Sequence, residues 1–111
     1  MSSIKGIGND IALISRFKNK SEHFIKRVLS LEEYDVYISL SEENKLTYLA
    51  SRFSAKEALF KAYKNLNFDF AKVSVLNKEN VEPFVKMDSP DTIHISISHD
   101  GDYVVTFVII E

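Results

Sequence analysis

Apolar residues follow a strand-like pattern at the start of the chain. Residues 4–14 are apolar at both odd and even positions with few exceptions. This pattern predicts a strand that is covered on both faces or lies in a subunit interface. Gly6 and Gly8 lie two residues apart on one face of this strand, where the absence of side chains permits another backbone to approach closely.

Helical spacing replaces this pattern between residues 15 and 64. Four apolar residues in the second part of segment 15–29 share one helix face: Phe24, Ile25, Val28 and Leu29. Ser30 and Glu33 fit a capping box at the start of a short helix. Ser41 is a second N-cap candidate, and the helix that it begins can run to about Lys64 because neither Gly nor Pro interrupts it.

The C-terminal part of the chain has the alternation of strands. Segments 73–76 and 84–87 are short strand candidates, and segment 93–98 alternates strictly between Ile and polar residues. Asp100-Gly101 predicts a two-residue hairpin turn into a strand over 103–110 that is apolar on both faces. The predicted fold class is α+β, with one long helix packed on an antiparallel sheet.

The composition indicates one ordinary globular domain over residues 1–111. Hydrophobic residues make up 45% of the 111 residues and charged residues 27%, which is unlike a disordered chain. The net charge of −2 argues against general nucleic-acid binding, and the lack of cysteine excludes disulfides and thiolate metal sites. The longest apolar runs are too short to cross a membrane and the N-terminus does not resemble a secretion signal, so we expect no membrane association and a cytoplasmic location.

A carboxylate interrupts the apolar stripe of the long predicted helix. Six residues form this stripe: Leu46, Leu49, Ala50, Phe53, Glu57 and Phe60. An isolated buried carboxylate costs several kcal/mol, so Glu57 must be paired, protonated or bound to a metal. Lys61 lies one turn further on, and a Glu57–Lys61 ion pair at the edge of the core is one interpretation.

Asp10 is a second unexpected carboxylate, in a strand nearly free of charge. Its position puts it on the same face as Gly6, Gly8 and Ala12, and on its own it fits an Asp that caps a strand end. Asp10 and Glu57 together favour another interpretation. Two carboxylates from separate elements, with water and phosphate oxygens, form the oxygen shell that magnesium prefers.

Two further features have both a functional and a structural interpretation. His99 ends the Ile-rich strand, where it can reach a ligand at the sheet edge or simply flank the turn. Segment 16–27 contains five basic residues and one acidic residue, although the whole chain is acidic. Such a basic patch suggests a particular acidic partner, or alternatively a solvated helix face.

Three motifs resemble those of the holo-[acyl-carrier-protein] synthases and follow in that family's order. They are Gly6-Ile-Gly-Asn-Asp-Ile11, Arg52-Phe-Ser-Ala-Lys-Glu-Ala58 with Lys61 after it, and His94-Ile-Ser-Ile-Ser-His99. The resemblance covers nearly the whole chain. It implies an enzyme that transfers 4′-phosphopantetheine from coenzyme A to a serine of the acyl carrier protein, requires magnesium and releases adenosine 3′,5′-bisphosphate. It also implies a homotrimer with active sites between subunits.

The resemblance also implies a role for each matching residue. Asp10 and Glu57 would be the magnesium ligands and, with Lys61, the catalytic residues. Lys61 would also hold a coenzyme A phosphate, and Arg52 and His99 would lie along the same nucleotide, with Lys56 a weaker candidate for that role. Arg16 and Arg27 match positions that contact the carrier protein, whose acidic recognition helix suits the basic patch.

Several alternatives stay open at this point. The proton of the attacking serine can pass to Glu57 or to a water on the metal. Departures from the family's pattern at Leu13, at Lys64-Asn-Leu-Asn67 and at Val81-Glu-Pro83 suggest a relative that binds coenzyme A or the carrier without catalysis, although the retained carboxylates and Lys61 argue against it. A scaffold without any ligand is the third interpretation. A single helix layer covers only one face of the sheet, so the other face requires another subunit or more of this chain.

Overall fold

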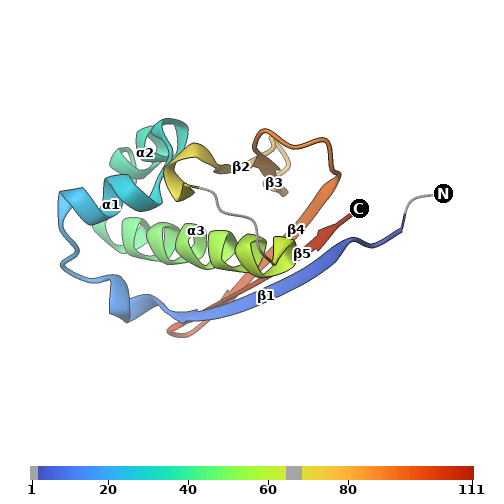
Figure 1. Ribbon diagram of the computed structural model, residues 1–111. Coiled ribbons are helices and arrows are strands. Elements are labelled where there is room, and N and C mark those ends of the chain that lie inside the picture. Colours follow the sequence, from blue (N-terminus) through green and yellow to red (C-terminus); the bar gives the residue numbers. More distant parts are fainter. Residues whose placement is uncertain (1–2, 65–68) are drawn as a thin grey trace.

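A long helix packed on an antiparallel sheet forms the centre of the molecule (Figure 1). The computed structural model describes residues 3–64 and 69–111. Strands β1 (Gly6–Leu13), β4 (Ile93–Asp100) and β5 (Tyr103–Ile110) form a sheet in the order β1-β5-β4, with both pairs antiparallel. Helix α3 (Glu42–Tyr63) crosses one face of this sheet. The predicted fold class is therefore confirmed.

The two glycines of β1 allow its backbone to lie directly against α3. A Cβ atom on Gly8 would come within 1.9 Å of the carbonyl oxygen of Ala58, and one on Gly6 within 1.9 Å of that of Ala62. Atoms at that distance overlap, so only glycine is compatible with this packing. The predicted close backbone approach at Gly6 and Gly8 is confirmed, and it brings the rest of β1 beside the C-terminal half of α3.

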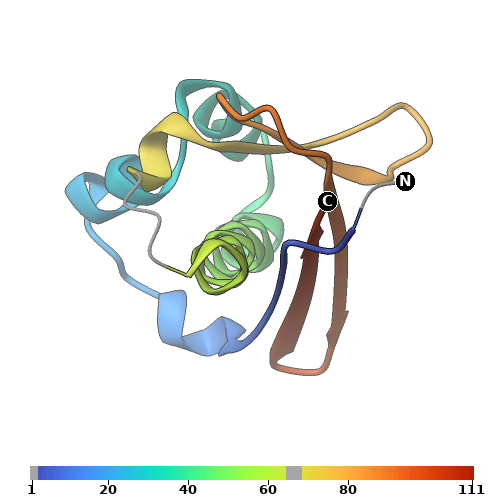
Figure 2. The ribbon, with the colours of Figure 1, turned by 45° about the vertical axis from the view of Figure 1, so that its right-hand side comes forward.

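Helix α3 is enclosed on two sides rather than on one. Its end-on view in Figure 2 shows the large sheet on one side and the shorter helices on the other. Ser54 hydrogen-bonds to Thr106 of β5, whereas Arg52 donates to the carbonyl of Val75 beyond the opposite side. The predicted single apolar stripe is therefore wrong at its end, because Phe60 lies on the edge between the two buried sides and is 46% exposed.

The ends of the helices follow the local hydrogen-bonding signals. Helices α1 (Glu22–Val28) and α2 (Leu31–Ile38) begin at serine N-caps, and the predicted capping box of Ser30 and Glu33 is present. Ser41 caps α3 by accepting from Asn44 N. Lys64 follows the last residue of α3 with a positive φ of 63°. The rest of the 64–67 loop lies outside the described residues.

A second, smaller sheet completes the fold. Strands β2 (Ser74–Asn77) and β3 (Pro83–Lys86) pair antiparallel, close to the predicted segments. Two short 3-10 helices flank the main elements, η1 (Ile14–Phe17) after β1 and η2 (Phe70–Lys72) before β2. No helix among the described residues is long and apolar enough to span a membrane.

The β4–β5 hairpin turns one residue later than predicted. Asp100 still pairs with Tyr103, so the turn residues are Gly101 and Asp102, and Gly101 has φ 57°. Glycine at the first turn position with positive φ suits the type II′ geometry of tight hairpins. Asp102 is therefore a turn residue outside the strand pairing, and its carboxylate accepts hydrogen bonds from both the backbone N and the hydroxyl of Ser15. This contact fixes η1, which carries Arg16, to the hairpin.

The outer face of the large sheet remains apolar and uncovered within one chain. Ile7 and Ile11 of β1 and Phe107 of β5 are 55%, 61% and 45% exposed. These residues alternate with the positions that face α3, so the whole outer side of β1 and β5 is involved. An apolar surface of this kind is typical of a face that is buried in an assembly.

Candidate active site

Asp10, Glu57 and Lys61 come together where β1 passes along α3. Lys61 Nζ lies 2.9 Å from the carbonyl oxygen of Asn9 and 3.3 Å from Asp10 Oδ1. Glu57 lies one helical turn before Lys61, close enough to Asp10 for the two carboxylates to affect each other electrostatically. The close packing at Gly8 is what brings the strand carboxylate to the helix residues.

The electrostatics of this cluster leave it with excess negative charge. Burial raises the pKa of Glu57, the neighbouring carboxylate of Asp10 raises it further, and Lys61 opposes both effects. Among the described residues Lys61 forms its ion pair with Asp10 and not with Glu57. Two carboxylates are thus balanced by only one ammonium group, so the cluster has a net negative charge that a further cation can neutralise.

The donor set fits a magnesium ion whose other ligands come from outside the protein. No group of three or more His, Cys, Asp or Glu that could hold a metal is found in the described part of the chain. Asp10 and Glu57 supply two hard oxygen donors, and magnesium usually takes only one or two carboxylates when phosphates and waters supply the rest. The residues present therefore fit this metal in the presence of a phosphate ligand.

The raised pKa of Glu57 predicts a pH-dependent gain in stability for Glu57→Gln in EDTA. Below the ordinary glutamate pKa of 4.5 the carboxyl is protonated in both the folded and the unfolded state, so its charge has no cost. As pH rises through the higher folded-state pKa, ionisation beside Asp10 lowers the stability of the wild type, and the variant escapes this loss. We expect the thermal midpoint of Glu57→Gln to be higher than that of the wild type at pH 7, and this difference to disappear near pH 4. Thermal unfolding across this range is the measurement, and a pH-independent difference would contradict it.

The structure separates Lys56 from the surface. Its side chain is fully buried, and Nζ donates to the carbonyls of Val28 and Phe70 and to Glu33 Oε1. Burial lowers the pKa of Lys56, and Glu33 opposes that effect. Because the three ammonium protons already have acceptors, we omit Lys56 from the coenzyme A contacts suggested by the sequence. Position 56 of α3 faces α1 and α2, and the spacing of apolar residues in the sequence does not reveal this.

Arg52 and His99 line one cavity of about 360 Å³ on another side of α3. The guanidinium of Arg52 donates to the carbonyl of Val75 and to Asn77 Oδ1, and it lies 4.1 Å from the ring centre of Tyr48. Burial lowers the pKa of Arg52 and raises that of Tyr48 to about 12. These contacts hold Arg52 in a single position, and His99 on β4 is exposed in the same cavity. Asn77 also lines this cavity, and no pattern in the sequence indicated it.

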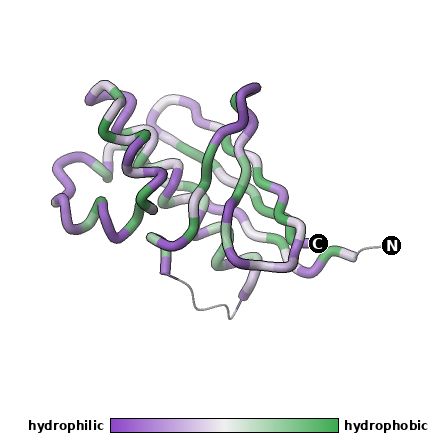
Figure 3. Tube along the Cα trace, turned by 90° about the horizontal axis from the view of Figure 1, so that it is seen from above, coloured by the Kyte–Doolittle hydropathy of each residue, from purple (hydrophilic) through white to green (hydrophobic). Residues whose placement is uncertain are grey.

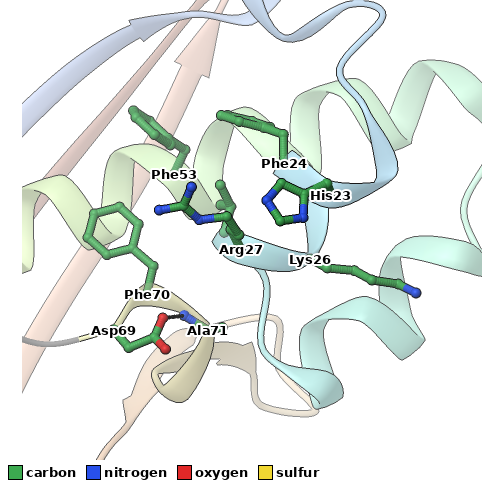
Figure 4. Close-up of a pocket in the computed structure, with 9 residues that line it drawn as sticks. His23, Phe24, Lys26, Arg27, Phe53, Asp69, Phe70 and Ala71 are labelled. Atoms are coloured by element: carbon green, nitrogen blue, oxygen red, sulfur yellow. Dashed lines mark hydrogen bonds between the residues drawn. The ribbon is translucent and has the colours of Figure 1, made fainter.

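Another cavity, of about 780 Å³, joins aromatic and basic side chains (Figure 4). We call it the aromatic cavity; Phe24, Phe53 and Phe70 line it together with Arg27, Lys26, His23, Val28, Asp69 and Ala71. Arg27 comes from α1 and Phe70 from η2, so the cavity lies between these two elements (Figure 4). Arg16 is exposed on η1 and is not among the residues that line it. The contribution of η2 had no sequence signal, because a three-residue helix lacks a period.

Comparison with known proteins identifies the family of the chain. Residues 6–108 match the family model of the 4′-phosphopantetheinyl transferase superfamily. The chain belongs to this superfamily. A holo-[acyl-carrier-protein] synthase of Mycoplasma mobile is 44% identical over 98% of this chain and 92% of the relative, and one of Mycoplasmopsis pulmonis is 42% identical over 92% and 86%.

Solved structures of this superfamily have the same fold. A holo-(acyl-carrier-protein) synthase of Bacillus anthracis, in complex with coenzyme A (3′,5′-ADP), has a TM-score of 0.93 at 30% identity and covers 99% of this chain and 98% of its own. That of Neisseria meningitidis has a TM-score of 0.87 at 27% identity, with 98% and 99% covered. The resemblance to the holo-[acyl-carrier-protein] synthases and the expectation that the chain is an enzyme of this kind are confirmed.

Proposed function

We propose that this superfamily member transfers 4′-phosphopantetheine from coenzyme A to a serine hydroxyl of an apo acyl carrier protein. The observation that carries the proposal is the convergence of Asp10, Glu57 and Lys61 on β1 and α3. Their donor set suits a diphosphate with a divalent cation, and the similar Bacillus anthracis structure is a complex with coenzyme A. A scaffold without a ligand gives no reason for two carboxylates to share one ammonium group.

Asp10 and Glu57 would hold magnesium in this enzyme. When bound, the ion would neutralise charge on the phosphate oxygens of coenzyme A. Lys61 is 52% exposed at its side chain, so its ammonium can also reach a phosphate while it stays beside Asp10. A fixed ammonium next to the reacting phosphate stabilises the negative charge that grows there during transfer.

The transfer itself breaks and forms one bond to phosphorus. The serine oxygen attacks the phosphorus that carries pantetheine, and the bond from that phosphorus to the bridging oxygen breaks. Adenosine 3′,5′-bisphosphate leaves with that oxygen. The serine proton passes to Glu57 or to a water, and the raised pKa of Glu57 makes its carboxylate a better proton acceptor than an ordinary glutamate.

The site is proposed to lie between subunits of a homotrimer. Arg52 and Glu57 are five residues apart on α3, so their side chains diverge by about 140° around the helix at about 100° per residue. A coenzyme A molecule that contacts an Arg52 and a Glu57 side chain is therefore easier to place if the two residues belong to two neighbouring chains than if they belong to one chain. The exposed apolar face of β1 and β5 supports such an assembly.

Sedimentation velocity tests the assembly. We expect a stable species of three chains at micromolar concentration, because the exposed apolar sheet face would otherwise remain in water. Ile11→Glu on that face should release monomers, whereas Leu31→Glu, at an exposed apolar residue of α2, is the matched control. A stable wild-type monomer at this concentration would contradict the trimer.

Arg16 and Arg27 are proposed to dock the carrier protein. The basic segment around α1 lies at the end of the molecule opposite the two chain termini (Figure 1), where hydrophilic positions, purple in Figure 3, alternate with hydrophobic ones. Beside it, the aromatic cavity offers apolar rings next to the Arg27 guanidinium. This combination suits a partner with acidic residues and an apolar side chain on one helix.

The docking proposal predicts that Arg16→Glu raises the KM for the carrier more than the KM for coenzyme A. We expect about a tenfold increase for the carrier, because a repulsive contact replaces an attractive one, and less than about a twofold change for coenzyme A. Steady-state kinetics with each substrate varied in turn is the measurement. The exposed basic residue Lys78, on another part of the chain, provides the control Lys78→Glu. Equal losses for both substrates would contradict the docking role.

Mass spectrometry of the carrier tests the reaction itself. The protein is incubated with apo acyl carrier protein of the same organism, coenzyme A and magnesium, with a parallel reaction in EDTA. We expect a carrier heavier by one phosphopantetheine only when the metal is present. An unmodified carrier despite measurable coenzyme A binding would favour the non-catalytic relative instead. The cytoplasmic location stays a prediction from the sequence.

A further inference from the structure

The largest fully buried side chain among the described residues is a charged one. Lys56 and Glu33 are both fully buried, and Lys56 Nζ lies 2.5 Å from Glu33 Oε1. A buried ion pair of this kind adds little net stability over apolar side chains of similar volume, because both charges lose their hydration. What such a pair does provide is a fixed geometry for the groups that it joins.

The ammonium of Lys56 joins three elements to α3. It donates to the carbonyl of Val28 at 2.6 Å, at the end of α1, and to the carbonyl of Phe70 at 2.9 Å, in η2. The last carbonyls of a helix have no partner within it, so the Val28 carbonyl gains one from Lys56. The third proton goes to Glu33 of α2.

Glu33 extends these contacts to β2. Its Oε1 also accepts from the backbone N of Ser30 at 2.8 Å, and its Oε2 accepts from the backbone N of Val75 at 2.8 Å. We call Lys56, Glu33 and these hydrogen bonds the buried clamp. Since both carboxylate oxygens and all three ammonium protons are used, the elements that the clamp joins have little freedom to shift.

The buried clamp bonds to two walls of the aromatic cavity on the side that faces the protein interior. Val28 and Phe70 both line that cavity, and a single ammonium group binds both of their carbonyls. Arg27 precedes Val28 on one wall, and Asp69 and Ala71 flank Phe70 on the other (Figure 4). Lys56 itself does not line the cavity, so it acts on the cavity only through these carbonyls.

We propose that Lys56 and Glu33 are positioning residues for carrier-protein docking: their buried clamp sets the separation of α1 and η2 and so the shape of the cavity that receives the carrier. The inference rests on the proposed function. It replaces the role along coenzyme A that the sequence suggested for Lys56. Without the clamp, the end of α1 and η2 lose their common anchor, whereas the hydrogen bonds that Arg52 donates to the Val75 carbonyl and to Asn77 do not include the clamp; β2 loses only the bond from the backbone N of Val75 to Glu33.

The test uses kinetics with the two substrates varied separately in the full-length protein. Lys56→Met keeps the length of the side chain but leaves Glu33 buried without its partner, which can prevent folding. The double variant Lys56→Met/Glu33→Gln removes both charges and keeps an amide oxygen to accept from Ser30, although the backbone N of Val75 loses its carboxylate acceptor; we expect it to fold more readily than Lys56→Met because no unpaired charge is left buried. Ile110→Ala is the control, because it destabilises the core at a buried residue of β5 that does not line the aromatic cavity.

We expect the KM for the carrier to rise about tenfold in the clamp variants, with the KM for coenzyme A and the kcat at saturating carrier within about twofold of the wild type. Faster amide hydrogen exchange in segments 27–30 and 69–73, and not in Ile110→Ala, should accompany the change. An unchanged carrier KM, an equal rise in both KM values, or the same rise in Ile110→Ala would overturn the inference. A wild type that modifies no carrier would instead refute the proposed function, so the two failures are distinct.

Discussion

Glu57→Gln is expected to abolish phosphopantetheine transfer while the protein remains folded. The substitution removes the carboxylate that lies beside Asp10 and one turn before Lys61, and with it one of the two metal ligands of the proposed site. Loss of one electrostatic group that acts on a reacting phosphate costs about 10²–10³ in kcat, and loss of the metal with it costs more. We therefore expect a decrease of at least about 10³-fold in kcat.

Three measurements separate this outcome from simple unfolding or from a binding protein. The variant should show a thermal midpoint at pH 7 no lower than that of the wild type, because it removes a desolvated charge. Carrier binding should be unchanged, since the proposed docking residues are on α1 and η1. Glu43→Gln, an exposed carboxylate in the first turn of the same helix, is the matched control and should retain full activity. Full turnover in Glu57→Gln would remove Glu57 from the site and with it the proposed mechanism.

Gly8→Ala is expected to destabilise the fold strongly. The new Cβ would lie 1.9 Å from the carbonyl oxygen of Ala58, so β1 must move away from α3. Overpacking against backbone costs about 3 kcal/mol or more, since neither partner has a side-chain rotation to relieve it. The displacement would also separate Asp10 from Glu57, so we expect transfer activity to fall together with stability.

Urea unfolding provides the measurement, and two variants provide controls. Asn9→Ala changes an exposed side chain of the same strand and should alter the free energy of unfolding by less than about 0.5 kcal/mol. Ala58→Gly in the Gly8→Ala background should not restore stability, because the clash involves the carbonyl oxygen and not the methyl group of Ala58. Wild-type stability in Gly8→Ala would mean that β1 and α3 are further apart than the structure has them.

Both predictions depend on the same structural relation, the contact between β1 and α3. The two glycines of β1 determine how closely the strand packs on α3. This close packing places the Asp10 carboxylate beside Glu57 and Lys61. Burial and, after it, the neighbouring carboxylate of Asp10 raise the pKa of Glu57, which is a cost to stability in the free protein. A bound cation would remove that cost, as we expect if the proposed site holds a ligand at the expense of the stability of the free chain.

The sequence alone determined those features that depend on neighbours along the chain. Ser30 with Glu33 and Ser41 mark helix starts because their side chains bond backbone groups three residues away. The alternation of Ile93–Ser98 specifies a strand with one apolar face, since side chains of a strand point to opposite sides in turn. The sequence also singled out Asp10 and Glu57 as carboxylates in apolar surroundings, although it left open a Glu57–Lys61 ion pair and a capping role for Asp10.

Only the tertiary structure decided which side of α3 each residue faces. A helix buried on two sides has no single apolar stripe, so the period of the sequence could not tell that Lys56 points into the interior or that Phe60 lies on an open edge. The aromatic cavity likewise depends on η2, whose Phe70 carbonyl accepts from the same buried Lys56 ammonium as the Val28 carbonyl at the end of α1. Contacts of this range have no periodic signal in a sequence, because they arise from how separate elements pack and not from the geometry of any one of them.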